Sequence, residues 1–427
     1  MKTPVDRRTF LGSAAAAGLA AGATRTVRAV TSDSANDTVV LGVMGVNGRG
    51  TDLARSFAAK RNTQIAYICD VDRRAIEKCQ GEVAQRQDRA TQGVGDFRRI
   101  LEDPNVDALV VAAPNHWHAP ATILACEAGK HVYVEKPASH NPHEGELMVA
   151  AARKHNRVVQ LGTQRRSSGA ITEGIQKLRE GAIGDVLYAR SWYNNRRGSI
   201  GQGKQAAVPE WLDYELWQGP APDVPYQDNV VHYNWHWFWN WGNGELGNNG
   251  IHSIDVCRWG LGVDYPTKVT CFGGKYRHQD DQQTPDTCVA TFEFGDKSMM
   301  WEGLSWSPRG YEQTSFGMSF HGEGGTMIMT EGYEILDMQN RSVETYSGGG
   351  GGLDHMEDFL DAIRTSRRPN ADIEDGHKST LLCHLGNIAH RVGRVLTTDP
   401  SNGHIQNDPE AAALWKREYR PGWEPKV

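Results

Sequence analysis

The sequence has no cysteine pattern typical of a metal centre or of a disulfide framework. Its seven cysteines are odd in number, none forms a Cys-x-x-Cys pair, and no Cys/His spacing matches a zinc module. Cys69, Cys271 and Cys288 lie in apolar alternating runs, where a cysteine behaves as a small buried hydrophobe. We therefore expect neither a disulfide framework nor a metal site.

Long apolar runs and an excess of basic residues are also lacking. The apolar run of residues 13–23 is about half the length that spans a bilayer, so no stable membrane span is expected. The formal net charge of −6 provides no positive field to attract nucleic acid. The 427 residues, 39% hydrophobic and 23% charged, are typical of a soluble globular protein. Two domains are expected, because a single core stops growing near roughly 250–300 residues.

The first 29 residues have the order of an export signal. Arg7 and Arg8 precede a Phe-Leu pair and the small apolar run, and cleavage after Ala23 or after Ala29 fits equally well. The paired arginines resemble the twin-arginine signal, which exports folded proteins, typically with a cofactor already bound. The alternative is an alanine-rich helix. We expect residues 1–29 to be a signal peptide and the mature protein, of net charge −10 without them, to be periplasmic or extracellular.

Apolar strands alternate with helical segments from residue 36 to residue 162. Strands are predicted at Val39–Met44, Gln64–Cys69, Val106–Ala112, His131–Val134 and Arg157–Leu161. Continuous apolar strands separated by helices are typical of a parallel sheet covered on both faces. Residues 36–162 are therefore predicted to form a doubly wound α/β domain of the Rossmann type.

Beyond Gly162 the pattern changes to alternating β-rich segments. Strands are predicted at Val186–Trp192, Thr267–Tyr276, Thr287–Phe294, Ser298–Trp306, Ser315–Phe320 and Thr326–Met329. Amphipathic helices are expected near residues 353–363 and 377–396. Residues 163–427 are predicted to form an α+β domain with a large, mostly antiparallel open sheet.

A glycine-rich turn follows the first predicted strand. Residues 45–50 keep the first and last glycines of Gly-x-Gly-x-x-Gly, with Asn47 at the middle position. Between a strand and a helix, such a turn lets a pyrophosphate approach the backbone at the helix N-terminus. Asp70 ends the next strand, where a carboxylate accepts the ribose hydroxyls. The pattern predicts NAD as cofactor, and Arg73 and Arg74 keep NADP open as the alternative.

Four motifs together resemble the Gfo/Idh/MocA family of sugar and cyclitol oxidoreductases, which includes glucose-fructose oxidoreductase and inositol dehydrogenase. They are the glycine turn, Pro114-Asn115-His116-Trp117-His118, Glu135-Lys136-Pro137 and Gly250-Ile251-His252-Ser253-Ile254-Asp255. The resemblance covers nearly the whole chain after the signal. It implies an NAD(P)-dependent oxidoreductase, with the C-terminal domain binding substrate, and a dimer or tetramer formed through the open sheet.

The resemblance also implies a catalytic trio. In family members the lysine of the Glu-Lys-Pro motif, here Lys136, lies between nicotinamide and substrate, where it would hold an alkoxide-like oxygen. His252 fits the general base. The aspartate that the family places four residues earlier is here Asn248. Residues i and i+4 share a helix face, so Asn248 can position the hydroxyl that His252 deprotonates, but it cannot itself take a proton.

The other candidate residues form a cofactor set and a substrate set. Cofactor contacts are expected from Gly45, Asn47, Gly48, Arg49, Gly50, Asp70, Pro114, Asn115, His118, Glu135 and Lys136. Substrate contacts are expected from Gln164, Arg165, Trp192, Trp235 and His236. His116 and His118 as metal ligands would need a third ligand at metal spacing, which is missing. If residues 235–241 are extended, their four alternating tryptophans share one face, as a sugar-binding wall or as an interface or core stripe.

Three functions fit these residues. The first is hydride transfer between tightly bound NAD(P) and a hydroxyl of a sugar, cyclitol or glycoside. The second is a redox-neutral, NAD-dependent glycoside hydrolase that oxidises a ring hydroxyl, eliminates the aglycone, adds water and reduces again. Export favours a cofactor restored in every cycle, since no pool of free NAD is expected outside the cytoplasm. The third, a non-catalytic sugar-binding protein, is disfavoured by the presence of Lys136 and His252.

Overall fold

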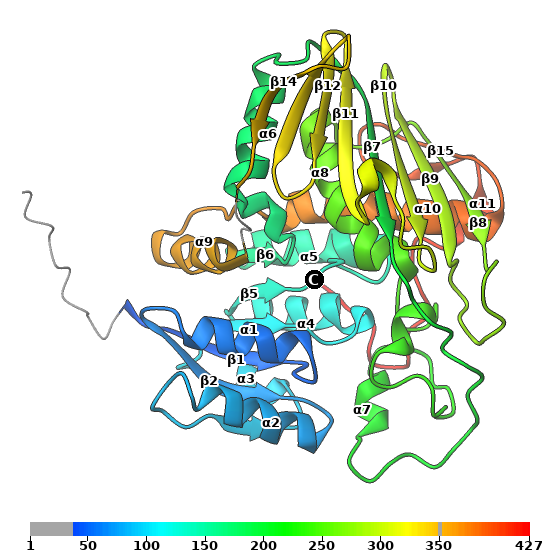
Figure 1. Cartoon of the computed structure of the whole chain (residues 1–427). Helices are drawn as coiled ribbons and strands as arrows, with labels where there is room; N and C mark the ends of the chain where they lie inside the picture. Colours follow the sequence, from blue (N-terminus) through cyan, green and yellow to red (C-terminus); the bar gives the residue numbers. More distant parts are fainter. Residues whose placement is uncertain (1–36, 349–351) are drawn as a thin grey trace, which may run out of the picture. The chain divides into compact units, whose positions relative to one another are not determined.

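Two β-sheets and their covering helices make up the part of the chain that the structure describes (Figure 1). The structure is a computed structural model that describes residues 37–348 and 352–427. The predicted signal peptide, residues 1–29, lies outside these residues. From Asp37 onward the chain forms one compact unit. Within the described ranges, no helix is both long enough and apolar enough to cross a membrane.

The first sheet is parallel throughout, which confirms the doubly wound prediction. Its strand order is β3-β2-β1-β4-β5-β6. The strands are β1 Val39–Met44, β2 Thr63–Cys69, β3 Gln92–Val94, β4 Ala108–Val111, β5 His131–Val134 and β6 Val159–Leu161. The order reverses between β1 and β4, and in open α/β sheets ligands bind outside the carboxyl ends of the strands at such a point.

Helices cover both faces of this sheet. They are α1 Arg49–Ala58, α2 Arg73–Val83, α3 Arg98–Leu101, α4 Asn115–Glu127, α5 Pro142–Lys154 and the later helix α9 Gly352–Thr365. Apolar side chains of α1, α2 and α9 share one core with the sheet, and those of α3, α4 and α5 share another. Phe359 of α9 packs edge to face with Phe57 and Tyr133, at centroid distances of 6.2 and 5.8 Å. A segment late in the sequence therefore completes the N-terminal core.

The second sheet is large and mostly antiparallel, as predicted. Its order is β14-β13-β12-β11-β7-β10-β9-β8-β15-β16, and β7 pairs with β10 in parallel. The strands are β7 Val186–Asn194, β8 Lys268–Gly274, β9 Thr287–Phe294, β10 Lys297–Leu304, β11 Phe316–Gly322, β12 Gly325–Met329, β13 Tyr333–Asp337, β14 Ser342–Tyr346, β15 Leu396–Thr398 and β16 Ile405–Gln406. Pairing between distant segments extends the sheet beyond the strands that alternation alone predicts.

Among residues 37–348 and 352–427, helices cover one face of the second sheet. The remaining helices are α6 Gly169–Arg179, α7 Tyr214–Gln218, α8 Ile251–Leu261, α10 Ile373–Val392 and α11 Pro409–Ala413. Apolar residues of α6, α8 and α10 share one core with the strands. The buried and less buried positions alternate along β9 and β10, as expected for a sheet covered on one side. The helix α8 is thereby held against the sheet, and it carries His252.

Two expectations about tryptophans need correction. Trp192, expected at the substrate, is 1% exposed, its Nε1 donates to the carbonyl of Thr314 (3.1 Å), and Tyr311 packs against it edge to face. The run 235–241 is not extended, because Asn234–Trp237 forms a 3₁₀ turn. Its four tryptophans therefore do not share one face, because a turn stands where the alternation would need an extended strand.

We predict that Trp192→Ala lowers the free energy of unfolding by about 3–5 kcal/mol, because it leaves a large cavity beside the sheet. Denaturant unfolding of the purified protein measures this loss. Trp306→Ala is the control, since Trp306 is 37% exposed and its removal should cost much less. Unchanged stability together with a raised KM for substrate would instead restore Trp192 to the substrate site.

Candidate active site

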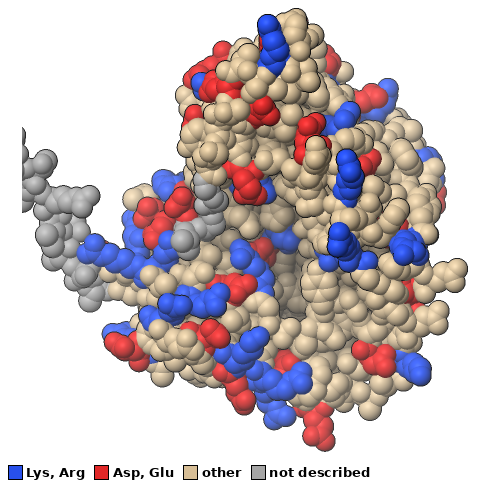
Figure 2. All heavy atoms as spheres, in the orientation of Figure 1, with Lys and Arg blue, Asp and Glu red and all other residues tan. Residues whose placement is uncertain are grey.

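A cavity of ≈540 Å³ lies at the carboxyl ends of the parallel strands. It is lined by the ends of β1, β2, β4 and β5 together with residues 216–252 of the C-terminal part, and Figure 2 shows a hollow between the two sheet-bearing regions. The predicted residues that line it are Gly45, Asn47, Gly48, Arg49, Asp70, Pro114, Asn115, His118, Glu135, Lys136, Gln164, Trp235, His236, Asn248 and His252. The structure thus brings most of the predicted cofactor and substrate residues to one place.

The glycine turn fits a dinucleotide phosphate. Gly45 has φ +84°, and a Cβ there would lie 2.4 Å from the backbone nitrogen of Ala113, so only glycine is accommodated. A Cβ on Gly50 would meet the carbonyl oxygen of Gly45 at 2.2 Å, which explains why Gly50 packs the turn and does not line the cavity. Gly48, where α1 begins, has no atom within 4 Å of its Cβ position. A ligand can therefore reach the backbone at this helix N-terminus.

Asp70 joins the glycine turn to the end of β2. Its carboxylate accepts hydrogen bonds from the backbone N–H groups of Val46 (2.7 Å) and Asp72 (2.9 Å). Burial raises the pKa of this carboxyl above its ordinary value, and both backbone hydrogen bonds oppose that shift. Each oxygen keeps a second lone pair, so Asp70 can also accept from ribose hydroxyls at the cavity wall.

Arg73 and Arg74, which left NADP as an alternative cofactor, contact other residues. Arg74 pairs with Asp72 (2.8 Å) and lies over the ring of Trp211 at 3.6 Å. Arg73 donates to the carbonyl of Glu210 (3.1 Å). Neither arginine lines the cavity. The carboxylate of Asp70 is therefore the charge presented to the ribose, which favours NAD over NADP.

The Glu-Lys-Pro segment is fixed by contacts to neighbouring strands and helices. Arg49 pairs with the buried carboxylate of Glu135 (2.8 Å), which joins the start of α1 to the end of β5. The ring of His118 lies between two carbonyls, with Nδ1 2.6 Å from Pro137 O and Nε2 2.8 Å from Ala113 O. These contacts leave little freedom for the residue between them, Lys136.

Lys136 reaches across the cavity to the C-terminal part. Its Nζ donates to the backbone carbonyl of Asn248 (2.7 Å) and to Oδ1 of the same residue (3.1 Å). Burial lowers the pKa of Lys136 below its ordinary value, opposed by the carboxylates of Glu135 and Glu245. Because Oδ1 faces the ammonium, the Asn248 amide nitrogen is left as a donor for another group.

Asn248 lies in an unusual helical turn. Residues Leu246–Gly250 form a π-helical turn that runs directly into α8, where His252 is the second residue. The sequence leads us to expect an ordinary α-helical i, i+4 pair, so the local geometry is corrected to a wider turn. Both residues still line the cavity. Such π turns occur frequently at functional sites.

His252 is a neutral imidazole in this environment. Burial lowers its pKa well below 6.5, and the charges of Lys136 and Arg165 lower it further. Among the described residues, no hydrogen bond to either of its ring nitrogens is found. A neutral, unpaired imidazole facing the cavity can accept a proton from a bound hydroxyl.

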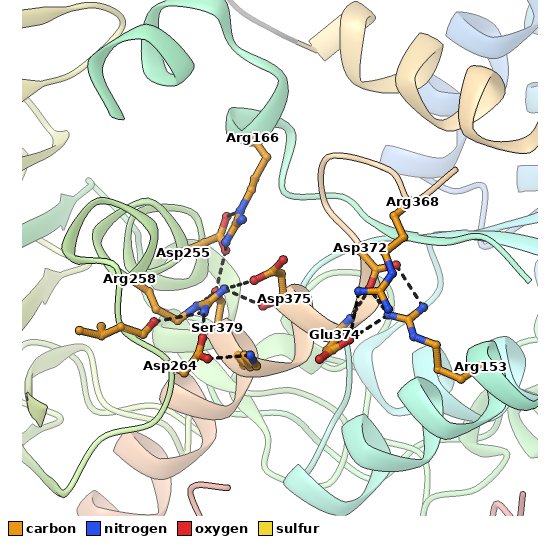
Figure 3. A network of polar contacts seen from close by, with 12 residues as sticks. Arg153, Arg166, Asp255, Arg258, Asp264, Arg368, Asp372, Glu374, Asp375 and Ser379 are labelled. Atoms are coloured by element: carbon orange, nitrogen blue, oxygen red, sulfur yellow. Dashed lines mark hydrogen bonds and ion pairs between the residues drawn. The ribbon is translucent and has the colours of Figure 1, made fainter. Parts of the chain in front are cut away.

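A buried ion-pair network holds α8 in place (Figure 3). Arg166 makes a two-point contact with Asp255 of α8, at 2.9 and 2.8 Å, and both side chains are buried. Ser379 of α10 donates to Asp255 (2.6 Å) and accepts from Arg258 (2.9 Å). Asp255 therefore acts as a packing anchor one helical turn beyond His252, away from the cavity lining.

Three predicted site residues do not line the cavity: Gly50, Arg165 and Trp192. Arg165 lies over the ring of Phe316 (4.4 Å) and donates to the carbonyl of Thr330 (3.0 Å), so it contacts the second sheet. Conversely, sequence reasoning missed several lining residues: Phe97, Trp117, Leu216, Trp217, His232 and Tyr233. His232 and Tyr233 adjoin the tryptophan run, and Trp117 lies within the Pro114–His118 motif, so both patterns were available signals. Phe97, Leu216 and Trp217 come from segments without a motif.

Two family models match most of the chain. Residues 39–163 match the NAD-binding Rossmann fold of an oxidoreductase family, GFO_IDH_MocA, and residues 190–425 match the C-terminal alpha/beta domain of that family. The matched ranges include the glycine turn, Lys136, Asn248 and His252. The N-terminal domain is thereby an NAD-binding one.

Curated relatives match this chain over part of their length. A glycosyl hydrolase family 109 protein of Saccharopolyspora erythraea is 29% identical over 44% of this chain and 46% of its own length. Levoglucosan dehydrogenase of Pseudarthrobacter phenanthrenivorans is 27% identical over 44% of this chain and 43% of its own. The chain thus matches somewhat less than half the length of these two relatives.

Solved structures share the fold. Levoglucosan dehydrogenase in complex with NADH and levoglucosan has a TM-score of 0.67, at 18% identity over 84% of this chain and 99% of that one. Aldose-aldose oxidoreductase from Caulobacter crescentus, in complex with glycerol, has a TM-score of 0.64, at 20% identity over 84% and 99%. At these identities the likeness concerns the arrangement of the elements.

We predict that Asp70→Ala weakens NAD binding by roughly tenfold or more, because two charge-assisted hydrogen bonds to the ribose are lost. The same change should reduce the ratio of the affinity for NAD to the affinity for NADP, because the charge that repels a 2′-phosphate is removed. Calorimetric titration with each nucleotide measures both effects. Glu77→Gln, at an exposed position of α2, is the matched control. Equal binding of both nucleotides before and after the change would remove Asp70 from the ribose site.

Proposed function

The chain belongs to the Gfo/Idh/MocA oxidoreductase family, and from this membership and the cavity we propose that it transfers a hydride between tightly held NAD and a hydroxyl-bearing carbon of a sugar, cyclitol or glycoside. The observation that carries the proposal is the hydrogen bond of Lys136 to Asn248 across the cavity, beside a neutral His252. Bound NAD would supply the hydride acceptor, which is a carbon of its nicotinamide ring.

Residues of the protein accept the proton of the substrate hydroxyl and stabilise the negative charge that develops on its oxygen. His252 accepts the proton of the hydroxyl whose carbon is oxidised. The ammonium of Lys136 stabilises the negative charge that develops on that oxygen, and it does so strongly because the site is buried. The amide nitrogen of Asn248 donates to a substrate oxygen and orients it. Trp235 and His236, stacked with centroids 3.6 Å apart, offer ring surfaces at the cavity wall.

A redox-neutral glycoside hydrolase is the second candidate, and the match to a glycosyl hydrolase family 109 protein favours it. Oxidation of a ring hydroxyl acidifies the neighbouring C–H, which allows the aglycone to leave; water then adds and the hydride returns. The same Lys136 and His252 serve the oxidation and the final reduction. Both candidates need bound NAD, and they differ in whether a net electron transfer occurs.

We also propose export and self-association. The paired Arg7 and Arg8 before an apolar run support a twin-arginine signal within residues 1–29, and hence a periplasmic or extracellular enzyme. A cofactor carried out of the cytoplasm must be restored in place, which agrees with tight binding. In the part of the chain that the structure describes, one face of the second sheet has no helix over it, and exposed Phe272 on β8 supports a dimer or tetramer formed through a sheet surface.

The decisive experiment for the proposed function examines bound cofactor and product together. The purified mature protein is denatured and its supernatant analysed for NAD(H); the native protein is then given free sugars and aryl glycosides while the NADH absorbance band is recorded. Stoichiometric reduction supports the dehydrogenase, and aglycone release without NADH accumulation supports the hydrolase. A protein that neither retains nor binds the nucleotide overturns both.

We expect Lys136→Ala to reduce turnover by at least about a hundredfold, because a buried positive group no longer stabilises the developing charge. Cofactor binding should be retained, since the glycine turn and Asp70 are untouched. Activity and bound nucleotide are measured on the same preparation. Lys378→Ala, a lysine that pairs with Asp264 outside the cavity, serves as the control. Near-normal turnover of Lys136→Ala would refute its role.

The pH dependence of kcat/KM should follow from the shifted pKa values of His252 and Lys136. His252 must be neutral to accept a proton, and its pKa lies well below 6.5, so the acid limb should lie below pH 6.5. Lys136 must be charged, and its pKa is lowered from 10.5, so the alkaline limb should lie below pH 10.5. Lys136→Arg, if active, should move the alkaline limb upward, because guanidinium stays charged. An acid limb above pH 6.5 would contradict the role of His252.

A further inference from the structure

A second cavity of ≈340 Å³ lies apart from the first and shares no lining residue with it. It is bounded by the start of α5, one face of α10, the loop 239–243 and the segment 414–418. The α10 residues that face it, His384, Asn387, Ile388 and Arg391, follow helical spacing. A built wall of four segments, rather than one surface loop, therefore encloses the space.

Two arginines bring positive charge to this cavity without a carboxylate partner. Arg417 donates to the carbonyl of Asn240 (3.0 Å), to Nδ1 of His140 (3.2 Å) and to the carbonyl of Glu418 (3.2 Å), all of them neutral acceptors. Arg391 lies over the ring of Trp239 at 5.4 Å. In the described ranges, neither guanidinium has a carboxylate within ion-pair distance. Arg417 is half-buried and Arg391 is exposed, and both guanidinium groups can therefore pair with an anion bound in the cavity.

The histidines of the cavity do not add to this charge. Because Arg417 donates to Nδ1 of His140, that nitrogen is an acceptor, and Nε2 carries the proton that points to the carbonyl of Trp239 (3.0 Å). Burial lowers the pKa of His140 well below 6.5 and that of His384 to about 3. Both rings are neutral at pH 7, so the positive charge at the cavity comes from the arginines.

One nearby carboxylate, that of Glu144, offsets part of the charge of Arg417, although the two make no ion-pair contact. Glu144 is buried behind the wall, where its oxygens accept from the hydroxyl of Tyr419 and from the backbone N–H of His140, both at 2.9 Å. Glu418 is exposed at the rim, and Lys416 beside it pairs with Glu424. The cavity therefore keeps the positive charge of Arg391 and, in part, that of Arg417.

Asn243 adds a hydrogen-bond acceptor that lacks a donor. The residue is 5% exposed. Its Nδ2 donates to the backbone carbonyl of His140, and its backbone carbonyl accepts from Nδ2 of Asn387, both at 2.9 Å. Its Oδ1 is buried and has no hydrogen-bond partner. Leaving a buried acceptor unpaired is costly, so a ligand hydroxyl is the group that this atom would accept from.

We infer that this second cavity binds a hydroxylated carboxylate, an acidic monosaccharide of the hexuronate class. Its carboxylate would pair with Arg417 and Arg391, a hydroxyl would donate to Asn243 Oδ1, and the C–H face would lie on Trp239. The volume falls within the range of small-molecule sites. The inference does not depend on the proposed reaction, because it concerns binding at residues that line only this cavity.

Calorimetric titration of the folded protein with D-glucuronate, D-glucose and inorganic sulfate tests the inference. D-Glucuronate should bind, and Arg391→Ala should weaken it about tenfold or more, as loss of a charged hydrogen bond does. Arg391 is exposed, so this variant keeps its packing. Arg86→Ala, an exposed arginine on the N-terminal part, is the charge-matched control and should bind normally. Sulfate should compete weakly, since it lacks the hydroxyl.

The same titration with Lys136→Ala separates the two cavities. Retained glucuronate binding in this variant, with loss in Arg391→Ala, supports the second cavity. Loss in Lys136→Ala with no effect of Arg391→Ala places the ligand in the active-site cavity and overturns the inference. Absence of glucuronate binding, or sulfate and glucose binding as tightly as glucuronate, overturns it as well.

Discussion

The hydrogen bonds of Lys136 Nζ to Asn248 are the contact on which the active site depends. They join the carboxyl end of β5, in the parallel sheet, to the π-helical turn before α8, in the C-terminal part. A buried ammonium must be hydrogen-bonded, and here both acceptors are neutral oxygens rather than a carboxylate. Among the described residues no carboxylate lies in ion-pair contact with this ammonium, although Glu135 and Glu245 act on it from farther away, so it remains available to an oxygen that becomes negative in the cavity.

The position of α8 is fixed from the opposite side. Asp255 accepts two hydrogen bonds from Arg166 and one from Ser379, so the helix is tied both to the segment after β6 and to α10 (Figure 3). Breaking a buried pair of this kind leaves an uncompensated charge, which is why such anchors hold geometry firmly. His252, one turn earlier, is held by these contacts while its ring stays unpaired. Packing and reactivity are thus divided between neighbouring residues of one helix.

Local patterns in the sequence predicted the architecture well. The apolar runs and turns that predict β1, β2, β4, β5 and β6, and the alternation in β7 to β12, reflect burial that each segment carries in its own residues. The glycine turn was predictable because φ and close backbone approach restrict the residue type, and Asp70 was predictable because it ends the next strand. The lining residue Trp217 and the covered position of Trp192 were not, since both depend on contacts with distant segments. The π turn at Asn248 likewise has no local pattern.

Transfer of deuterium tests the central claim that hydride passes to the bound cofactor beside Lys136 and His252. The purified protein is mixed with a sugar or glycoside that it converts and that is deuterated at its ring carbons. The cofactor is extracted within the first turnovers, and its mass is measured by mass spectrometry. The account predicts reduced cofactor that carries one deuterium, whether the hydride then stays or returns. Product formation while the extracted cofactor never acquires deuterium would contradict it.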